Sequence, residues 1–258
     1  PLYEQVLADR VRVLGPDHPD TLTSRNNLAG AYESAGRLDE AIPLLEEVLA
    51  DCVRVLGPDH PDTLTSRNNL ACTYESAGRL DEAIPLLEEV LADRVRVLGD
   101  DHPDTLASRN NLAYAYRAAG RLGEAIPLLE EVLADRVRVL GPDHPDTLAS
   151  RNNLAGAYYS AGRLGEAIPL LEEVLADRVR VLGPYHPDTL ISRNNLAHAY
   201  QAAGRHHEAI TLFKNTLKVC EEVLSPGHPL TTRVRENLEA LERETNPAPA
   251  SSPESSDG

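Results

Sequence analysis

Residues 21–35 read TLTSRNNLAGAYESA, and this stretch returns four more times along the chain. The later copies are TLTSRNNLACTYESA at 63–77, TLASRNNLAYAYRAA at 105–119, TLASRNNLAGAYYSA at 147–161 and TLISRNNLAHAYQAA at 189–203, so the period is 42 residues. A fixed period of roughly 20 to 50 residues is the signature of a solenoid, in which each repeat buries its apolar face against its neighbours. The sequence therefore predicts a stack of similar units.

Each unit is predicted to hold two helices, which we call helix A and helix B. Pro19 suits the first position of helix A, where its missing N–H costs nothing, and Gly36 provides the backbone freedom for its end. Helix B follows at 38–56, with apolar residues every three or four positions, and Pro43 is tolerated about one turn inside it. Further helices A are expected at 62–77, 104–119, 146–161 and 188–203, and further helices B at 81–97, 123–139, 165–181 and 207–223.

The ends of the chain depart from this pattern. Residues 1–14 match only the end of helix B and predict a partial repeat, whereas 15–224 hold five helix pairs. Residues 225–244 predict a capping helix, because Glu239 and Glu242 replace the Ala and Tyr of the repeats and would be costly in a buried seam. The tail 245–258 is rich in Pro, Ser and acidic residues and is expected to be disordered. Because the chain starts in what reads as the middle of a helix, we expect it to be part of a longer protein.

The composition narrows the classes of partner and compartment. A net charge of −16 disfavours nucleic acid and anionic membrane surfaces, which bind clustered Lys and Arg. There is no apolar run of membrane-spanning length and no signal peptide. The three cysteines, Cys52, Cys72 and Cys220, show no paired spacing, which argues against a disulfide framework or a zinc site and fits a reducing, cytoplasmic compartment.

A helical projection divides helix A into two faces. The predicted seam, which packs on neighbouring helices, contains Thr21, Leu22, Arg25, Leu28, Ala29, Tyr32 and Ala35. The opposite face contains Thr23, Asn26, Asn27, Gly30, Glu33 and Ser34. Arg25 is the one charged residue in the seam, so we expect its stem to pack while its guanidinium finds a carboxylate or carbonyl partner.

The residue pattern resembles the tetratricopeptide repeat, which has a small residue eight positions in, Tyr at eleven, Gly at fifteen and Ala at twenty. Here these are Ala29, Tyr32, Gly36 and Ala41. The 42-residue period and the LGPDHPDTL, NNLAxAY and GRLxEA motifs are similar to the kinesin light chain type and its bacterial relatives, over residues 1 to about 243. Arg25 departs from the family, which usually has a bulky apolar residue there.

The resemblance implies an all-α, right-handed superhelical solenoid of antiparallel helix pairs. It also implies that helices A line a concave surface on which extended peptides lie. The groove would then comprise Thr23, Asn26, Asn27, Gly30, Glu33 and their equivalents in the other units.

Comparing the five units with one another shows where they differ. Three columns of helix A vary most, and all three lie on the face opposite the seam, whereas the exposed Glu46 and Glu47 columns stay constant through the first four units. We interpret this as diversification of a binding groove on a rigid scaffold, with recent duplication and too few changes as the alternative. The varying columns are Gly30, Cys72, Tyr114, Gly156 and His198; Glu33, Glu75, Arg117, Tyr159 and Gln201; and Thr23, Thr65, Ala107, Ala149 and Ile191.

A pair of asparagines on this face does not vary. Amides carry donors and an acceptor, so a row of them can bind a peptide backbone without reading its side chains; the alternative is that one asparagine of each pair bonds a neighbouring helix. The predicted peptide-binding pairs are Asn26 and Asn27, Asn68 and Asn69, Asn110 and Asn111, Asn152 and Asn153, and Asn194 and Asn195.

Selectivity is expected from the varying columns. Tyr114, Arg117 and Tyr159 form the richest predicted patch, because aromatic residues and Arg dominate binding hot spots. Kinesin light chain grooves accept acidic peptides, but Glu33 and Glu75 predict a neutral or basic segment here, so that preference is not carried over. His198 and Gln201 complete the predicted site.

Histidines that recur along the chain raise the question of a metal site. Those at helix starts lie a whole repeat apart and cannot converge on one ion, so capping or loop packing is expected. His198, His206 and His207 lack a clear fourth ligand, and no metal or other cofactor is predicted. The periodic histidines are His18, His60, His102, His144, His186 and His228.

No enzymatic motif supports a catalytic function. The chain has no glycine-rich phosphate loop, no G-x-S-x-G and no acid–base pair outside the repeat pattern. The sequence therefore predicts a non-catalytic scaffold that binds a protein or peptide, as part of a larger signalling or adaptor protein. The alternative is a structural array that self-associates head to tail through its uncapped N-terminal half-repeat.

Overall fold

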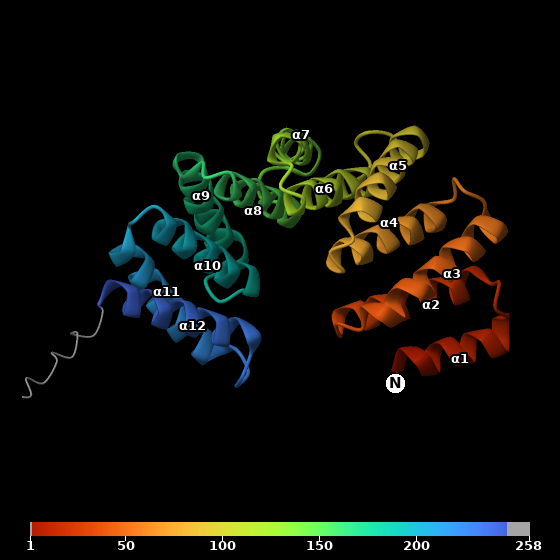
Figure 1. Ribbon diagram of the computed structural model, residues 1–258, viewed down its shortest axis with the longest axis horizontal. Helices are drawn as coiled ribbons and strands as arrows, with labels where there is room; N and C mark the ends of the chain where they lie inside the picture. Colours follow the sequence, from red (N-terminus) through yellow and green to blue (C-terminus); the bar gives the residue numbers. More distant parts are fainter. Residues whose placement is uncertain (1, 247–258) are drawn as a thin grey trace, which may run out of the picture. The chain divides into compact units, whose positions relative to one another are not determined.

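The computed structural model describes residues 2–246. Within this range every regular element is an α-helix, twelve in all (Figure 1), as the sequence predicts. The chain divides into two units, residues 1–139 and 140–258, and each is described by itself.

The first unit holds α1 (Leu2–Leu14), α2 (Pro19–Ser34), α3 (Leu38–Leu56), α4 (Pro61–Ser76), α5 (Leu80–Leu98), α6 (Pro103–Ala118) and α7 (Leu122–Leu140), apart from the last residue of α7. The second holds α8 (Pro145–Ser160), α9 (Leu164–Leu182), α10 (Pro187–Ala202), α11 (His206–Val223) and α12 (Pro229–Thr245). The predicted helices of residues 1–224 agree with these bounds to within one residue, and the helix in the predicted capping segment 225–244 begins at Pro229. The predicted tail begins at Thr245, which is the last residue of α12; residues 247–258 lie outside the described residues.

Local chemistry accounts for the helix boundaries. At the start of α2, His18 is the N-cap and its Nδ1 accepts a hydrogen bond of 3.1 Å from the backbone N–H of Asp20, with Pro19 in the first turn. Gly36, at φ +73°, follows the end of α2, and Pro43 remains inside α3. The predicted capping role of the periodic histidines is confirmed at all six: His18, His60, His102, His144, His186 and His228.

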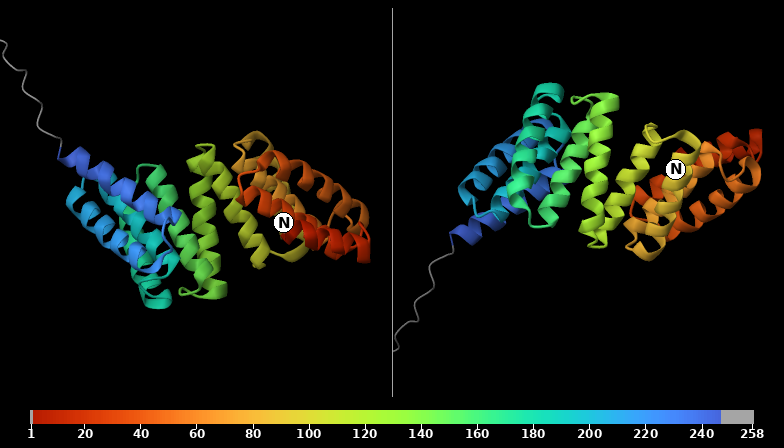
Figure 2. Two further views of the ribbon diagram at one scale, coloured as in Figure 1. Left: turned by 90° about the horizontal axis from the view of Figure 1, so that it is seen from below. Right: turned by 90° about the horizontal axis from the view of Figure 1, so that it is seen from above.

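The helices pack as consecutive antiparallel pairs. In the first unit α2 contacts α1, α3 and the next helix A, α4, and Figure 2 shows α1–α4 lying side by side. Of the predicted seam of α2, Thr21, Leu22, Leu28 and Ala29 are buried. The prediction is wrong for Ala35, which is exposed because the helix has already ended at Ser34.

The last helix of the second unit differs on its two sides. Its apolar residues are buried against α10 and α11, whereas Glu239 is exposed and Glu242 forms an ion pair of 2.7 Å with Lys214. The two glutamates therefore lie away from the apolar seam, as their charge requires. The buried residues of α12 are Leu230, Thr231, Val234, Leu238 and Leu241.

Candidate functional site

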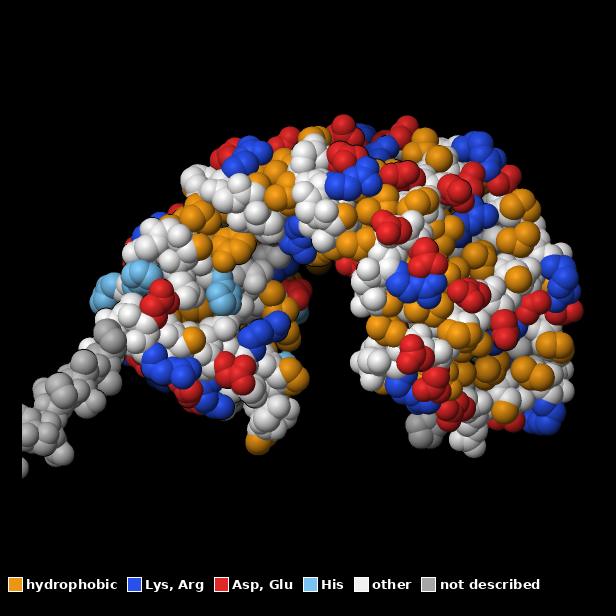
Figure 3. All heavy atoms as spheres, viewed as in Figure 1, with side chains coloured by type: hydrophobic (Ala, Val, Ile, Leu, Met, Phe, Trp, Pro, Cys, Tyr) orange, Lys and Arg blue, Asp and Glu red, His pale blue; other side chains and the backbone are white. Residues whose placement is uncertain are grey.

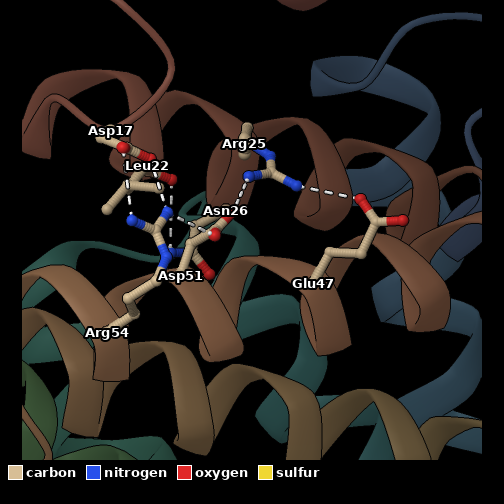
Figure 4. A network of polar contacts seen from close by, with 7 residues as sticks. All are labelled: Asp17, Leu22, Arg25, Asn26, Glu47, Asp51 and Arg54. Atoms are coloured by element: carbon tan, nitrogen blue, oxygen red, sulfur yellow. Dashed lines mark hydrogen bonds and ion pairs between the residues drawn. The ribbon is translucent and has the colours of Figure 1, made fainter.

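Arg25 is held by carboxylates of its own repeat. Its guanidinium lies 2.6 Å from Asp51 and 3.0 Å from Glu47, both on α3, while Arg54 joins Asp51 (2.8 Å) to Asp17 (2.6 Å) (Figure 4). Hydrogen bonds from Arg54 and then from Arg25 hold the pKa of Asp51 below its usual value. The predicted partner of Arg25 is confirmed. The pair recurs as Arg67–Asp93 (2.8 Å), Arg109–Asp135 (2.9 Å) and Arg151–Asp177 (2.6 Å).

The tyrosine of the repeat pattern, Tyr32 and its equivalents, is also held by contacts with other helices. The Tyr74 hydroxyl donates to Glu46 at 2.8 Å, and the guanidinium of Arg79 lies 4.3 Å from the centre of its ring. Burial first, and then the bond to Glu46, raises the pKa of Tyr74 to about 12. The same bond joins Tyr32 to Glu4, Tyr116 to Glu88 and Tyr200 to Glu172.

These bonds give a structural reason why glutamates of helix B do not vary between repeats. Glu46 accepts from Tyr74 and Glu47 pairs with Arg25, so neither is an idle surface position. Acidic and basic side chains lie interspersed over the face of the first unit seen in Figure 3. The constancy of the Glu46 column is explained by its bonds to tyrosines of the next repeat, and this column therefore gives no measure of drift against which the varying columns can be judged.

On α2 the face that is left open is the one predicted from the projection, whereas on α4, α6, α8 and α10 most of the equivalent positions are half-buried or buried. On α2, Thr23, Asn27, Gly30 and Ser34 are exposed. Asn26 and Glu33, also on this side of the helix, are half-buried, as are their equivalents on α4 and α6. In each unit this side of one helix A lies beside the next, since α2 contacts α4, α4 contacts α6, and α10 contacts both α8 and α12.

The asparagines of neighbouring helices A bond to one another. Asn111 donates to the Oδ1 of Asn68 at 3.2 Å, within the first unit. The second unit repeats the bond from Asn195 to Asn152 (3.1 Å) and from Asn237 to Asn194 (3.3 Å), where Asn194 is buried. For these pairs the alternative in which the amide bonds a neighbouring helix is therefore the observed one. Each donated bond uses one of the two N–H groups of the amide.

This ladder of amides is interrupted at the first repeat. The Nδ2 of Asn26 lies 3.5 Å from its own helix at the carbonyl of Leu22, and its Oδ1 is buried without a hydrogen-bond partner among residues 2–246. A cavity of about 480 Å³ lies here, lined by residues of α1–α4. Both Asn26 and Asn69, the pair that would continue the ladder, line it.

The varying columns meet different surroundings. Gly30 faces open space, whereas Cys72, one repeat later, is largely buried, and this burial raises its pKa to about 12. Arg117 stacks on Tyr114, with its guanidinium 4.7 Å from the ring centre. The structure thus brings these two predicted residues together in the first unit, while Tyr159, which is exposed, belongs to the second.

The last predicted residues are held by α11 and α12. The ring of His198 lies edge-on against Phe213, with 5.3 Å between ring centres, and 2.9 Å from the amide of Asn237. Its burial lowers its pKa. Gln201 lies 3.4 Å from Glu244. The sequence did not indicate these contacts, because they depend on the terminal helix and not on the repeat.

Comparison with known proteins places the chain among helical repeats. The family model described as tetratricopeptide repeat matches residues 1–52, 26–94, 76–136, 110–178, 154–213 and 188–252. A crystal structure of a Podosopora anserina protein described as a kinesin light chain with nearly identical TPR-like repeats is 37% identical; it covers 90% of this chain and 99% of its own, with a TM-score of 0.65.

Two further proteins are similar. BtubC from P. vanneervenii shares the fold, with a TM-score of 0.68 at 22% identity over 98% of this chain and 96% of its own. The Arabidopsis thaliana protein kinesin light chain-related 2 is 49% identical over 41 residues, which are 16% of this chain and 6% of the relative. Across residues 2–246, no helix combines the length and apolarity that crossing a membrane requires.

Proposed function

Because this chain belongs to the tetratricopeptide repeat family, as its residue pattern predicts, we propose that it is a scaffold that binds an extended segment of another protein. Repeats of this family generally bind proteins or peptides, and the kinesin light chain-like members are non-catalytic scaffolds. We place the bound segment on the open face of helices A. We further propose that the scaffold works without catalysis, as one arm of a larger signalling or adaptor protein.

One observation carries the choice of this face. The other sides of helix A are occupied by bonds that repeat along the chain, such as Arg25 to Asp51 and Tyr74 to Glu46. The open face keeps hydrogen-bonding groups that the protein itself does not use, most clearly the Oδ1 of Asn26 beside a cavity. Polar groups on a rigid support that lack internal partners are what a peptide backbone can satisfy.

Self-association remains the second candidate, and α1 favours it. This helix has no buried residue, and Leu2, Tyr3 and Val13 are exposed by 71%, 51% and 66% of their surface. However, head-to-tail stacking would set α1 against the outer side of α12, where Glu239 is exposed. Charges at that position make a poor partner for an apolar helix, so we favour binding of another protein. Light scattering over a concentration series tests this, and a mass that grows with concentration would favour stacking.

A reducing, cytoplasmic compartment fits this role. All three cysteines are free thiols, and Cys52 and Cys220 are buried. Burial raises the pKa of both thiols, which keeps them protonated and slow to oxidise. A chain that folds around unpaired cysteines is suited to a compartment in which thiols stay reduced.

Selection of random displayed peptides on the intact chain tests the proposed function. Selected peptides are then titrated by fluorescence anisotropy against a double variant of the open face, Tyr114→Ala with Arg117→Ala, and against Glu89→Gln as a control on an exposed part of helix B of the second repeat. We expect the affinity of peptides bound near these residues to fall at least about tenfold in the double variant, because aromatic and Arg anchors dominate hot spots, and to stay unchanged in the control. Failure to select any peptide, or equal affinity for all three proteins, would refute the proposal.

A further inference from the structure

The cavity beside α2 has a chemical character of its own. It measures about 480 Å³, within the range of small-ligand sites, and it is bounded by α2 and α4 with Tyr3 of α1 and Leu45 of α3. Its helix A residues include Asn26, Glu33 and Thr73. All of these belong to the first unit, so the cavity is complete within it.

The first feature of the cavity is an acceptor without a donor. In three other places along the chain, the Oδ1 of this asparagine column accepts from the asparagine of the next helix A. Here the Oδ1 of Asn26 is buried, and nothing in residues 2–246 donates to it, although Asn69 lines the same cavity. A buried carbonyl oxygen that lacks a hydrogen bond is costly, so a ligand that brings an N–H gains what the protein leaves unmade.

The second feature is a carboxylate without a cation. Glu33 lies with one oxygen 2.8 Å from the Ser76 hydroxyl and the other 3.1 Å from the Thr73 hydroxyl. Within the described chain no Arg or Lys forms an ion pair with it, whereas the other half-buried acid of this repeat, Asp51, is paired with two arginines. Neutral hydroxyls orient the carboxylate of Glu33 but leave its charge uncompensated. The raised pKa of the neighbouring Cys72 thiol is caused by burial first and then by Glu33 and Glu75, which is consistent with a negative potential here.

The third feature is room. Gly30 lines the cavity, and a Cβ placed on it would meet nothing within 4 Å. In the third repeat the same position is Tyr114, whose ring is covered by Arg117. The first repeat therefore has space where the third repeat carries its own aromatic ring and cation.

We propose that this cavity binds the guanidinium of an arginine in the bound peptide, with Glu33 as its counter-ion, and that the Oδ1 of Asn26 accepts from a different N–H of the same peptide. The planar guanidinium presents several N–H donors in a fixed fork that matches a carboxylate, while Asn26, seven residues or about 10 Å earlier along the helix, meets another group of the peptide. The inference rests on the proposed function, since it assigns part of the ligand that the open face would hold. It makes the N-terminal end of this scaffold selective for basic segments.

The test uses display-selected peptides on the intact chain. Selection on the wild-type protein should enrich arginine, and selection on Glu33→Gln should lose that enrichment. Glu89→Gln is the matched control, because it makes the same change at an exposed glutamate of α5, outside the residues that line the cavity. Gly30→Tyr, the residue that the third repeat carries at this position, should block the cavity and abolish arginine-dependent binding.

A second measurement leaves the protein unaltered. Each selected peptide is resynthesised with citrulline, the neutral isostere of arginine, and both forms are titrated by fluorescence anisotropy. A charge-assisted bond of this kind contributes about a tenfold change in affinity or more, so citrulline should weaken binding to wild type by that factor and have little effect on Glu33→Gln.

The outcomes separate the two proposals. Peptides that bind the open face with equal affinity in their arginine and citrulline forms would overturn the arginine site and leave the proposed function standing. An arginine effect that survives Glu33→Gln would also overturn it. If no peptide is selected at all, the proposed function fails and the arginine site fails with it.

Discussion

The same serine is predicted to contribute unequally to stability in two repeats. Arg94 is buried and donates to the Ser108 hydroxyl at 2.8 Å and to the carbonyl of Asp104 at 2.9 Å. One repeat earlier the arginine is replaced by Cys52, and the facing Ser66 hydroxyl is buried against the Cys52 thiol, which is a weak hydrogen-bond partner. We predict that Ser108→Ala destabilises the protein and that Ser66→Ala does not.

The magnitudes follow from the partners. A hydrogen bond to a charged group contributes about 1.5–3 kcal/mol, and Ser108→Ala leaves the Arg94 guanidinium with one acceptor fewer while its Nε already lacks one. Burial lowers the pKa of Arg94, which shows that its charged form is poorly compensated. We therefore expect Ser108→Ala to lower the free energy of unfolding by about 2 kcal/mol. In contrast, Ser66→Ala removes a hydroxyl whose partner is the weakly bonding Cys52 thiol, and should change that energy by less than about 1 kcal/mol.

The measurement is urea unfolding followed by circular dichroism, with native-state hydrogen exchange to locate the effect. Repeat arrays can unfold in parts, so exchange at α4 and α5 is compared with exchange at α6 for each variant. A loss of stability in Ser66→Ala as large as that in Ser108→Ala would refute the reasoning, because it would show that the arginine bond does not distinguish the two sites.

The chain itself contains a third version of this contact. Cys220 stands one repeat after Arg178, in the same column as Cys52, and Val234 stands in the column of Ser66 and Ser108. Both Cys220 and Val234 are completely buried. Replacing both partners of a buried bond by apolar groups can be nearly neutral, whereas replacing one leaves the other unsatisfied. In the second repeat only one partner is replaced, because Cys52 stands in the arginine column while Ser66 remains.

Three further predictions concern protons, thiols and backbone. Burial and a glutamate raise the pKa of Tyr74, Tyr116 and Tyr200 to about 12. Their contribution to stability is therefore full below about pH 10 and is lost as the pH rises from 10 to 12. An absorbance titration should show that some tyrosines ionise only near the end of this range, and this late phase should shrink in Tyr116→Phe and disappear in urea. Burial raises the pKa of Cys52, Cys72 and Cys220. A disulfide reagent at pH 8 should therefore label these thiols slowly in the native protein and rapidly in the unfolded protein. Fast labelling of the native protein would contradict their burial. Gly78 has φ +74°, so Gly78→Ala should lower the free energy of unfolding by about 1–2 kcal/mol. Gly123 lies within α7 with open space around it, so Gly123→Ala should raise that energy by up to about 1 kcal/mol. Similar effects of the two substitutions in urea unfolding would exclude the backbone explanation.

The fold could be predicted from the sequence because its boundaries are marked by local chemistry. Pro19 and Gly36 act within a few residues of themselves, and the 42-residue period repeats that information five times. The partner of Arg25 was also predictable, since a charge in a helix seam requires compensation from the adjacent helix. In each case the signal and the structure that it causes lie within one repeat.

The candidate site was less predictable, because it depends on contacts between repeats. The bond from Asn111 to Asn68 joins residues 43 apart, and its formation depends on how two helices A are spaced. The constant Glu46 column looked like an idle surface until its bond to Tyr74 of the next repeat was known. Comparing the residues at equivalent positions of the repeats thus shows which positions correspond, but it does not show which of these side chains form hydrogen bonds or ion pairs.

That limit also shows where to look for function in such a chain. Asn26 and Asn68 are the same residue at the same place in their repeats, yet only Asn68 is bonded to the next helix A. Ser66 and Ser108 differ in the same way, since only Ser108 meets an arginine. The two groups are not alike, however. Ser66 is enclosed beside Cys52, whose thiol bonds it weakly, and it lines no described cavity, so its substitution affects stability alone. Asn26 borders a cavity with an uncompensated carboxylate, so its missing bond can be made by a ligand, and we therefore expect its substitution to change binding more than folding.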